Sequence, residues 1–346
     1  MRLLISLALM ASSSYAFAAR QVITLDANGY KAATANPAQM DPAKLYYTQK
    51  VLPFGEWSQK FPAEAKALNL YPGFIEPTVT KIKYGIEEKI VEKMMMFIVE
   101  AKMVLNKPPA QVSVANLIKM DNIRKFDPDL KPNPLPPNQL MPLVAGKGQI
   151  NNFQWCSKDS ILRPAREKDL SYLMPKGRAP WCSDTGRTTC VESCFLFSKG
   201  YNAAIMTLNQ VADDSEQKDY GIAFQSEIRH FSSEQEAGIA TPLQKLTGIP
   251  TAVRGGLEQN SFYFNQIFEY AKILGIMQDH PSDPTKTLAT VYFVVGVKER
   301  TWKTHDQVSV ILLGQSKFFN TATGITAGLP TFTQTTLNSI GQILEN

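Results

Sequence analysis

The sequence predicts an α+β protein in which antiparallel strands pack against one long C-terminal helix. Two patterns lead to this prediction. Apolar and polar residues alternate through several segments of the chain, and this is the period of strands that bury one face. The last segment, from Phe332 to Leu344, instead repeats apolar residues at intervals of three and four, the period of a helix that packs one side on a sheet.

The first residues have the pattern of a secretory signal peptide. A positive charge at Arg2 precedes a short apolar run, and Ala16 and Ala18 place small residues where a signal peptidase recognises them. The run is far shorter than the roughly 20 apolar residues that a membrane-spanning helix needs. We therefore expect cleavage after Ala18 and a periplasmic or secreted protein that does not span a membrane.

The charged residues argue against a nucleic-acid partner. The full chain carries a net charge of +5 at pH 7, and its lysine and arginine residues are scattered along the sequence. No basic run interleaves with aromatic residues, as a surface that follows phosphates would require. Glycine-rich phosphate loops are missing as well, and we expect neither a cofactor nor a metal ion.

The chain after the signal peptide divides into two parts. We interpret residues 19–77 as an N-terminal extension. Between Leu45 and Leu70, short apolar groups alternate with Pro53, Gly55 and Pro62, so any helix there is brief. Residues 78–346 form the α+β domain. A polar stretch rich in arginine, proline and glycine interrupts this domain at about residues 157–200, and we interpret it as an insertion.

The first half of the domain begins with strands and a helix. Alternation over residues 80–105 predicts two strands or one long bent strand. Pro108 and Pro109 stop this pattern, and residues 110–125 then predict a helix with a broad apolar face. A proline-rich loop follows over residues 130–147, and it leads to a strand near residues 150–156.

Strands dominate the second half of the domain. Residues 201–211 and 220–231 flank an acidic turn, which predicts a hairpin. Residues 288–300 and 307–319 predict a second pair of strands. Residues 242–256 suit a loop.

Two further segments complete the C-terminal part. Residues 261–273 suit either a strand or a helix, and both stay open. A loop that contains Gly324 and Gly328 leads to Pro330, which opens the terminal helix.

This order of elements resembles the helix-grip fold of START-like proteins, the superfamily of lipid-transfer proteins and polyketide cyclases. The residues that carry the resemblance are the stretch MVLNKPPAQV at 103–112 with KFDP at 125–128, and the segment from Gly324 into the terminal helix. The resemblance would cover residues 80–346. It implies a curved antiparallel sheet wrapped around the C-terminal helix, with a hydrophobic cavity between them that holds a lipid or another apolar ligand.

Five residues would line this cavity. Phe332, Leu337 and Ile340 lie on the apolar side of the terminal helix, and Phe224 and His230 share the apolar face of the strand at 220–231. His230 has two interpretations. It is either a polar group that orients a carboxylate or carbonyl of the ligand, or a hydrogen-bonded histidine of the core.

Four cysteines lie close together in the sequence and predict two disulfide bonds in an exported protein. They are Cys156, Cys182, Cys190 and Cys194. We favour a nested arrangement, in which Cys156 pairs with Cys194 at the neck of the insertion and Cys182 pairs with Cys190 at its tip. Pairing of Cys156 with Cys182 and of Cys190 with Cys194 is the alternative. The spacings are not those of a structural zinc site.

Two other functions stay open beside ligand binding. The stapled insertion carries or adjoins Trp155, Trp181, Arg178 and Arg187, residue types that are common in protein interfaces, so the protein could be an envelope assembly factor that binds a partner protein. A hydrolase would need His230 as a catalytic group, but the chain has no Gly-x-Ser-x-Gly motif. We predict no catalytic residue.

Overall fold

The computed structural model of the chain describes most of the two ends and parts of the middle. The described residues are 19–68, 78–83, 85–91, 93–118, 131–133, 153–156, 188–196, 221–237, 239, 241–261, 268–299, 308–312, 315–319 and 321–346. Residues 201–211, Cys182 and most of the predicted insertion lie outside them.

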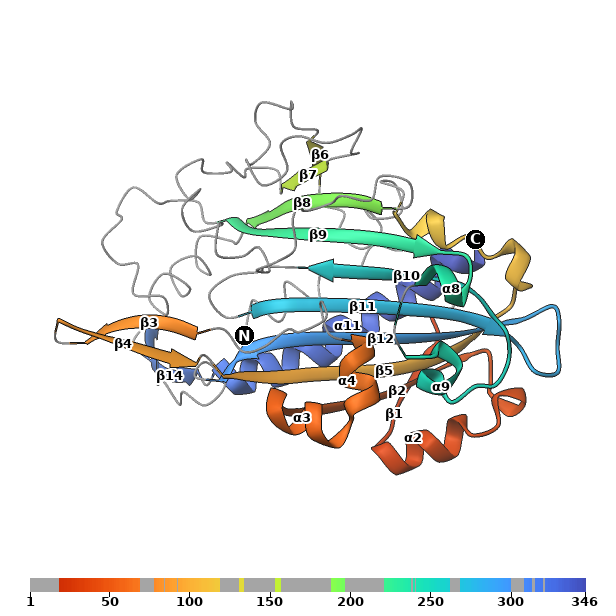
Figure 1. The fold of residues 1–346 in the computed structure, drawn as a ribbon, viewed down its shortest axis with the longest axis horizontal. Helices are drawn as coiled ribbons and strands as arrows, with labels where there is room; N and C mark the ends of the chain where they lie inside the picture. The colour runs from red at the N-terminus through yellow and green to blue at the C-terminus, as the bar shows by residue number, and fades with distance from the viewer. Residues whose placement is uncertain are drawn as a thin grey trace.

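Ten of the described strands form one open sheet (Figure 1). The sheet is mixed: β1 pairs with β2 and β7 with β8 in parallel, and the other neighbours are antiparallel. In spatial order the strands are β1 (Gln21–Thr24), β2 (Lys44–Pro53), β5 (Met94–Leu105), β12 (Thr287–Lys298), β11 (Phe268–Asp279), β10 (Val253–Ser261), β9 (Gly221–Phe231), β8 (Thr188–Leu196), β7 (Phe153–Cys156) and β6 (Lys131–Asn133).

Two hairpins lie outside this sheet. β3 (Thr78–Lys83) pairs with β4 (Ile86–Val91), and β13 (Val308–Leu312) pairs with β14 (Gln315–Phe319). The β3–β4 hairpin projects from one end of the sheet (Figure 1).

Helices cover both faces of the sheet. The long helix α11 (Thr321–Glu345) lies behind the sheet in Figure 1, and α3 (Phe54–Lys60), α4 (Pro62–Leu68) and α9 (Leu243–Thr247) lie in front of it. We call these the α11 face and the α4 face. The remaining helical segments are α2 (Ala27–Thr34), α8 (Glu234–Ala237) and the short 3₁₀ helices η1 (Pro37–Gln39), η2 (Pro109–Gln111) and η3 (Val114–Ile118).

Strand β5 is central to this arrangement. Eleven of its twelve residues are buried, because β2 and β12 flank it and helices cover it on both sides. A strand that is buried on both faces has a continuous run of apolar residues rather than an alternating pattern. This explains the sequence MMMFIVEAKMVL. Met96 and Ile98 belong to the core under α4, whereas Phe97 and Val99 belong to the core under α11.

The structure confirms the α+β class and a C-terminal helix that packs on the sheet. Residues 19–68 are part of the same body, since they supply β1 and β2 to the sheet and α2, α3 and α4 beside it. Any helix between Leu45 and Leu70 was expected to be brief, and α3 and α4 are seven residues each. Curvature of the sheet around α11, as in a helix-grip fold, stays a prediction.

Two predictions about local structure were wrong. The described part of residues 110–125 forms the 3₁₀ helices η2 and η3 instead of one α-helix. β-Branched and polar residues such as Val112, Ser113 and Val114 have low helix propensity, which favours short turns. The loop expected around Gly324 and Gly328 is helical instead, because α11 already begins at Thr321 and continues through Pro330.

The expected pairing of strands 288–300 and 307–319 was also wrong. β12 pairs with β5 and β11, whereas β13 pairs with β14. β9 pairs with β8 and β10 among the described strands, and the hairpin expected with residues 201–211 lies outside the described residues. The segment 242–256 contains α9 and the start of β10, and residues 268–273 belong to a strand. Alternation identifies a strand and its buried face, but it does not identify the neighbouring strand.

Candidate functional site

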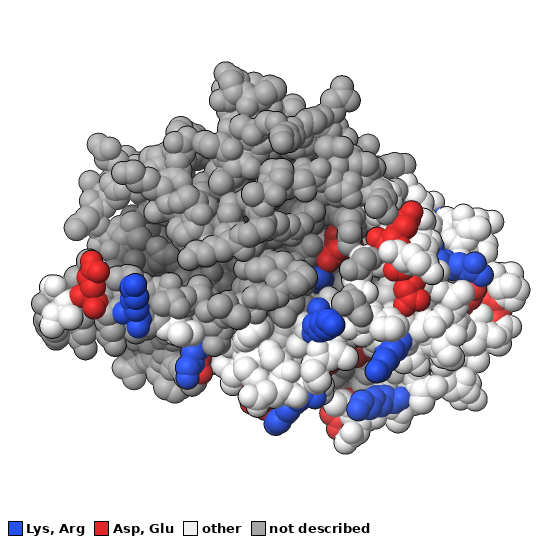
Figure 2. All heavy atoms as spheres, viewed as in Figure 1, with Lys and Arg blue, Asp and Glu red and all other residues white. Residues whose placement is uncertain are grey.

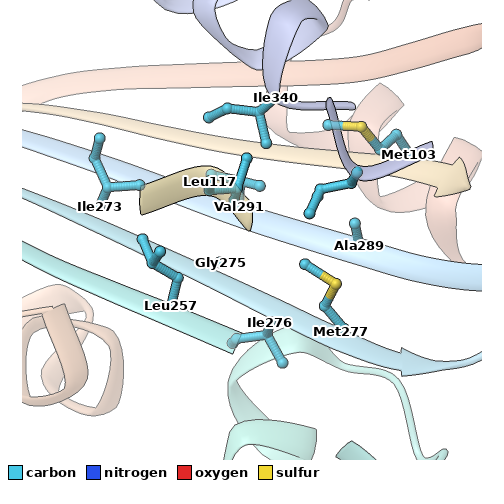
Figure 3. A pocket seen from close by; sticks show the side chains of 11 residues that line it. Met103, Leu117, Leu257, Ile273, Gly275, Ile276, Met277, Ala289, Val291 and Ile340 are labelled. Atoms are coloured by element: carbon cyan, nitrogen blue, oxygen red, sulfur yellow. The ribbon is translucent and has the colours of Figure 1, made fainter. Parts of the chain in front are cut away.

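A small apolar recess lies between the α11 face of the sheet and the segments that cover it (Figure 3). Its volume is about 20 Å³. Strands β5, β10, β11 and β12, the 3₁₀ helix η3 and the last turns of α11 contribute its walls. The lining residues are Met103, Leu117, Leu257, Ile273, Gly275, Ile276, Met277, Ala289, Val291, Ile340 and Leu344.

The recess exists because small residues form its floor. Gly275 of β11 lies between Leu257 of β10 and Val291 of β12 in the cross-strand register. A methyl group added at Gly275 would have only one neighbour within 4 Å, the Leu257 carbonyl oxygen at 3.9 Å. Ala289 is the next small residue on this face of β12. A larger side chain at either position would fill the space.

Three residues cover the floor. Leu117 comes from η3, and Ile340 and Leu344 come from α11 (Figure 3). η3 contacts α11, β9 and β10 and therefore bridges the helix and the far strands of the sheet. Since 3₁₀ helices have poorer hydrogen-bond geometry than α-helices, η3 is the weakest part of this cover.

The recess as it stands is closed to a large ligand. A space of 10–15 Å³ on this scale holds one water molecule, and sites for drug-sized ligands measure roughly 300–1,000 Å³. A volume of about 20 Å³ therefore accepts a group of a few atoms. An apolar ligand of any length requires the cover to move.

The structure brings two of the five predicted cavity residues to this region with described side chains. Ile340 lines the recess. Leu337, with 2% of its surface exposed, packs into the apolar core beside it. Phe224 lies on β9 and Phe332 on α11, but the side chains of both fall outside the described residues.

His230 lies next to the recess rather than in its wall. It is the cross-strand partner of Leu257, so both side chains leave the sheet on the α11 face. The following residue, Phe231, is buried in the core of the opposite face, as the alternation of a strand requires. His230 is half-buried, and its Nδ1 atom is buried with no hydrogen-bond partner among the described residues.

Arg20 fixes the C-terminal end of α11 over the sheet. Its guanidinium donates hydrogen bonds to the carbonyl oxygens of Val104 at 3.0 Å and Pro42 at 3.1 Å, and it forms an ion pair with Glu345. Glu345 also accepts a hydrogen bond from the backbone of Asn106 at 2.8 Å. This cluster holds the turn of α11 that carries Leu344 against β5.

Gly341 makes room for the Arg20 cluster. A methyl group at this position would lie 2.6 Å from Arg20 Nη1 and 2.8 Å from Met103 Sδ, so these two side chains would have to shift to accommodate any other residue. Arg20, Gly341 and Gly275 were not predicted from the sequence as part of this region. A glycine inside a strand pattern, as at Gly275, is the one available signal, since it marks a missing side chain or a close approach.

The α4 face carries buried polar groups. The Lys102 ammonium lies 2.6 Å from the Glu100 carboxylate, and the Tyr292 hydroxyl donates to the Leu246 carbonyl at 2.8 Å. Lys50 of β2 pairs with Glu64 of α4 at 2.7 Å. The Tyr292 and Lys50 contacts join the sheet to α9 and α4, whereas the Lys102–Glu100 pair lies within β5.

Burial on the α4 face shifts several pKa values. Burial, and then the nearby Glu100 carboxylate, raise the pKa of Tyr292 well above the usual range. Burial also raises the pKa of Glu64, although Lys50 opposes this shift. Within the described residues, no group of three or more histidine, cysteine, aspartate or glutamate side chains is placed to hold a metal ion.

The two cysteines at the neck of the predicted insertion lie on adjacent strands. Cys156 at the end of β7 is the register partner of Cys194 in β8. Neighbouring strands are 4.7–4.9 Å apart, and disulfide-bonded cysteines usually have Cα atoms 4.4–6.8 Å apart. The bond between Cys156 and Cys194 therefore stays a prediction that this register fits. Cys190 lies in β8 opposite Glu227.

Comparison with protein-family models, curated proteins and solved structures found no match. The resemblance to START-like proteins therefore gains no support from relatives. None of the helices in the described part of the chain is both long and apolar enough to cross a membrane.

Proposed function

We propose that this protein binds an apolar, lipid-like molecule between the α11 face of the sheet and its cover of η3 and α11. The observation that carries this proposal is the apolar recess above Gly275 and Ala289. Every side chain around it is apolar, and apolar pockets with few polar groups are the usual sites for small molecules. The helix-grip resemblance, which implies a ligand in the same place, supports the proposal.

Binding proceeds through displacement of η3. The recess holds only a few atoms, so the ligand replaces Leu117 against the sheet and η3 moves outward. α11 stays in place during this step, because Arg20 and Glu345 fix its end. The ligand recovers the apolar contacts that Leu117 gives up, which keeps the net cost of opening small.

The expected location of the protein suits such a carrier. The N-terminal pattern from Arg2 to Ala18 would deliver the chain outside the cytoplasm, where apolar molecules cross an aqueous space only when a protein carries them. On the face seen in Figure 2, acidic and basic side chains of the described residues are intermixed rather than gathered into one patch. This face therefore gives no sign of a strongly charged partner.

The test is uptake of an apolar dye by delipidated protein. The wild-type protein should bind Nile red with a rise in fluorescence, and fatty acids should displace the dye. Gly275→Leu should reduce dye binding at least tenfold, because the new side chain fills the floor of the recess. Gly55→Leu is the matched control, since Gly55 is exposed in α3 on the other face and a methyl group there meets nothing within 4 Å.

Two results would contradict the proposal. The first is a delipidated wild-type protein that takes up neither dye nor fatty acid. The second is a Gly275→Leu protein that remains folded and binds the dye as tightly as wild type and the Gly55→Leu control do.

The second candidate function is an envelope assembly factor that binds a partner protein through the insertion. The observation in its favour is the register of Cys156 and Cys194, which would brace the base of the insertion if the two residues were bonded. Because β8 begins at Thr188, a deletion that tests this idea must end at residue 187. Loss of partner capture with an intact sheet would support it, and unchanged capture would exclude it.

A further inference from the structure

One row of residues runs across the α11 face from the recess to His230. Val291, Gly275, Leu257 and His230 are successive cross-strand partners on β12, β11, β10 and β9. Three strand spacings separate the first residue from the last, which is about 14 Å. The first three of these residues line the recess, so His230 lies one strand beyond its wall.

The chemistry of this row changes at its end. All eleven residues that line the recess are apolar. His230 instead presents a buried Nδ1 atom with no hydrogen-bond partner among the described residues. Buried polar atoms are nearly always paired, so this atom calls for a partner that the described residues do not supply. An imidazole nitrogen either donates or accepts a hydrogen bond, depending on its tautomer.

η3 covers the His230 end of the row. It contacts both β9 and β10 and therefore spans the strands that carry His230 and Leu257. When η3 moves outward to admit a ligand, the groove that opens extends from the recess toward His230. A single movement thus exposes an apolar floor and one polar atom.

We infer that the ligand is an amphiphile with a single polar head, which forms a hydrogen bond with His230 Nδ1 while its apolar chain lies over Leu257, Gly275 and Val291. This inference rests on the proposed function. The head lies at β9 and the chain points toward β12 and β5. A second polar group along the chain would be buried without a partner among these apolar residues. The ligand class is therefore a fatty acid or fatty alcohol rather than a diol or a sugar.

The test compares three probes of equal chain length. Octanol, octanoic acid and octane should each displace Nile red from the wild-type protein. Octanol or octanoic acid should bind at least tenfold more tightly than octane, because only these probes offer a head to His230. His230→Phe should abolish this preference and leave octane binding unchanged. His230→Gln, which retains a polar amide, should restore part of the preference.

A control and a spectroscopic measurement separate a direct contact from a structural effect. His280→Phe changes a histidine in the loop after β11 and should preserve the preference for a polar head. In protein labelled with ¹⁵N-histidine, octanol or octanoic acid should shift the Nδ1 resonance of His230 by several ppm, and octane should not. This measurement needs no variant, so it tests the contact between the polar head and His230 even if His230→Phe does not fold.

The outcomes distinguish the role of His230 from the binding of an apolar ligand as such. Octane that binds as tightly as octanol and octanoic acid would overturn the role of His230 and leave the apolar site intact. A His230→Phe protein that is folded and keeps the preference would do the same. Failure of all three probes to bind would overturn the proposed function, and the inference with it.

Discussion

The two faces of the sheet differ in what holds their helices. On the α4 face, apolar packing is combined with ion pairs and hydrogen bonds between the sheet and the helices, such as Lys50 with Glu64. Under α11 and η3 the contacts are mainly apolar, and polar bonds are concentrated at the Arg20 cluster and at Tyr47. Ion pairs and hydrogen bonds need a defined geometry, whereas apolar contacts exchange partners easily. The difference suggests that the α4 face provides a rigid support and that the α11 face can open.

The largest effect should come from breaking the ion pair between Lys102 and Glu100. Lys102→Met leaves the half-buried Glu100 carboxylate without its cation, and a polar group that loses its partner in this way costs up to about 3 kcal/mol. We expect the unfolding free energy, measured with urea, to fall by about that amount. Lys60→Met, whose partner Glu56 is exposed, should change it by less than about 1 kcal/mol. Equal effects of the two variants would show that this pair adds no more to the stability of the α4 face than an exposed pair does.

Tyr47 provides a test of the α11 face at high pH. Burial raises the pKa of its hydroxyl from 10.0 to about 12, and the hydroxyl lies 3.2 Å from Thr333 Oγ1 of α11. The fold therefore favours the neutral phenol, and this contribution is complete below pH 10 and is lost as the pH rises from 10 to 12.

A shift of this size corresponds to about 2–3 kcal/mol. The unfolding free energy, measured with urea, should fall for both proteins between pH 10 and pH 12. The fall should be smaller for Tyr47→Phe than for wild type, by about that amount. The buried Tyr292 on the α4 face also titrates above its usual range and remains in both proteins, so the difference reports Tyr47 alone. Parallel losses in the two proteins would contradict the buried position of this hydroxyl.

Gly341→Ala should weaken the contact between α11 and β5. Replacing glycine by alanine inside a helix normally stabilises it by up to about 1 kcal/mol. Here the methyl group would collide with Arg20 and Met103, and overpacking costs about 1–3 kcal/mol. The net result should be a lower unfolding free energy, measured by thermal or urea unfolding. A more stable variant would show that α11 is held less closely than described.

Gly275→Ala should have the smallest effect and the opposite sign. The added methyl group enters the recess without a close contact, and the loss of backbone freedom in the unfolded chain stabilises the fold by about 0.4–1 kcal/mol. The same substitution at two glycines on the α11 face should therefore change the unfolding temperature in opposite directions. A destabilised Gly275→Ala protein would indicate that the recess is already filled.

The sequence predicted the strands better than their arrangement. The face of β9 that carries His230 followed from alternation, and the packing of Leu337 and Ile340 toward the sheet followed from helical spacing. The neighbours of β9 and β12 could not be predicted, because the period of a strand is the same whichever strand lies beside it. Residues 242–256 suited a loop, so Leu257 and the start of β10 went unrecognised as a wall of the recess.

The floor of the recess and the Arg20 cluster could not be predicted from the sequence for a different reason. Gly275 and Gly341 matter because they have no side chain, and this role can be recognised only when the element that packs against them is known. Arg20 and Glu345 are far apart in sequence, and nothing in their local patterns links them. Such effects depend on tertiary contacts, which outweigh the local preferences that sequence patterns report.

The link between Arg20 and Glu345 brings the two ends of the folded chain within the reach of one side chain. A short linker could therefore join Asn346 to Ala19, and new ends could be opened at the turn of the β3–β4 hairpin, where Gly85 and Ile86 are exposed. A circularly permuted protein of this kind would keep every strand of the main sheet in its place. An affinity tag placed directly before Ala19 or after Asn346, by contrast, would crowd the residues that hold α11 in position.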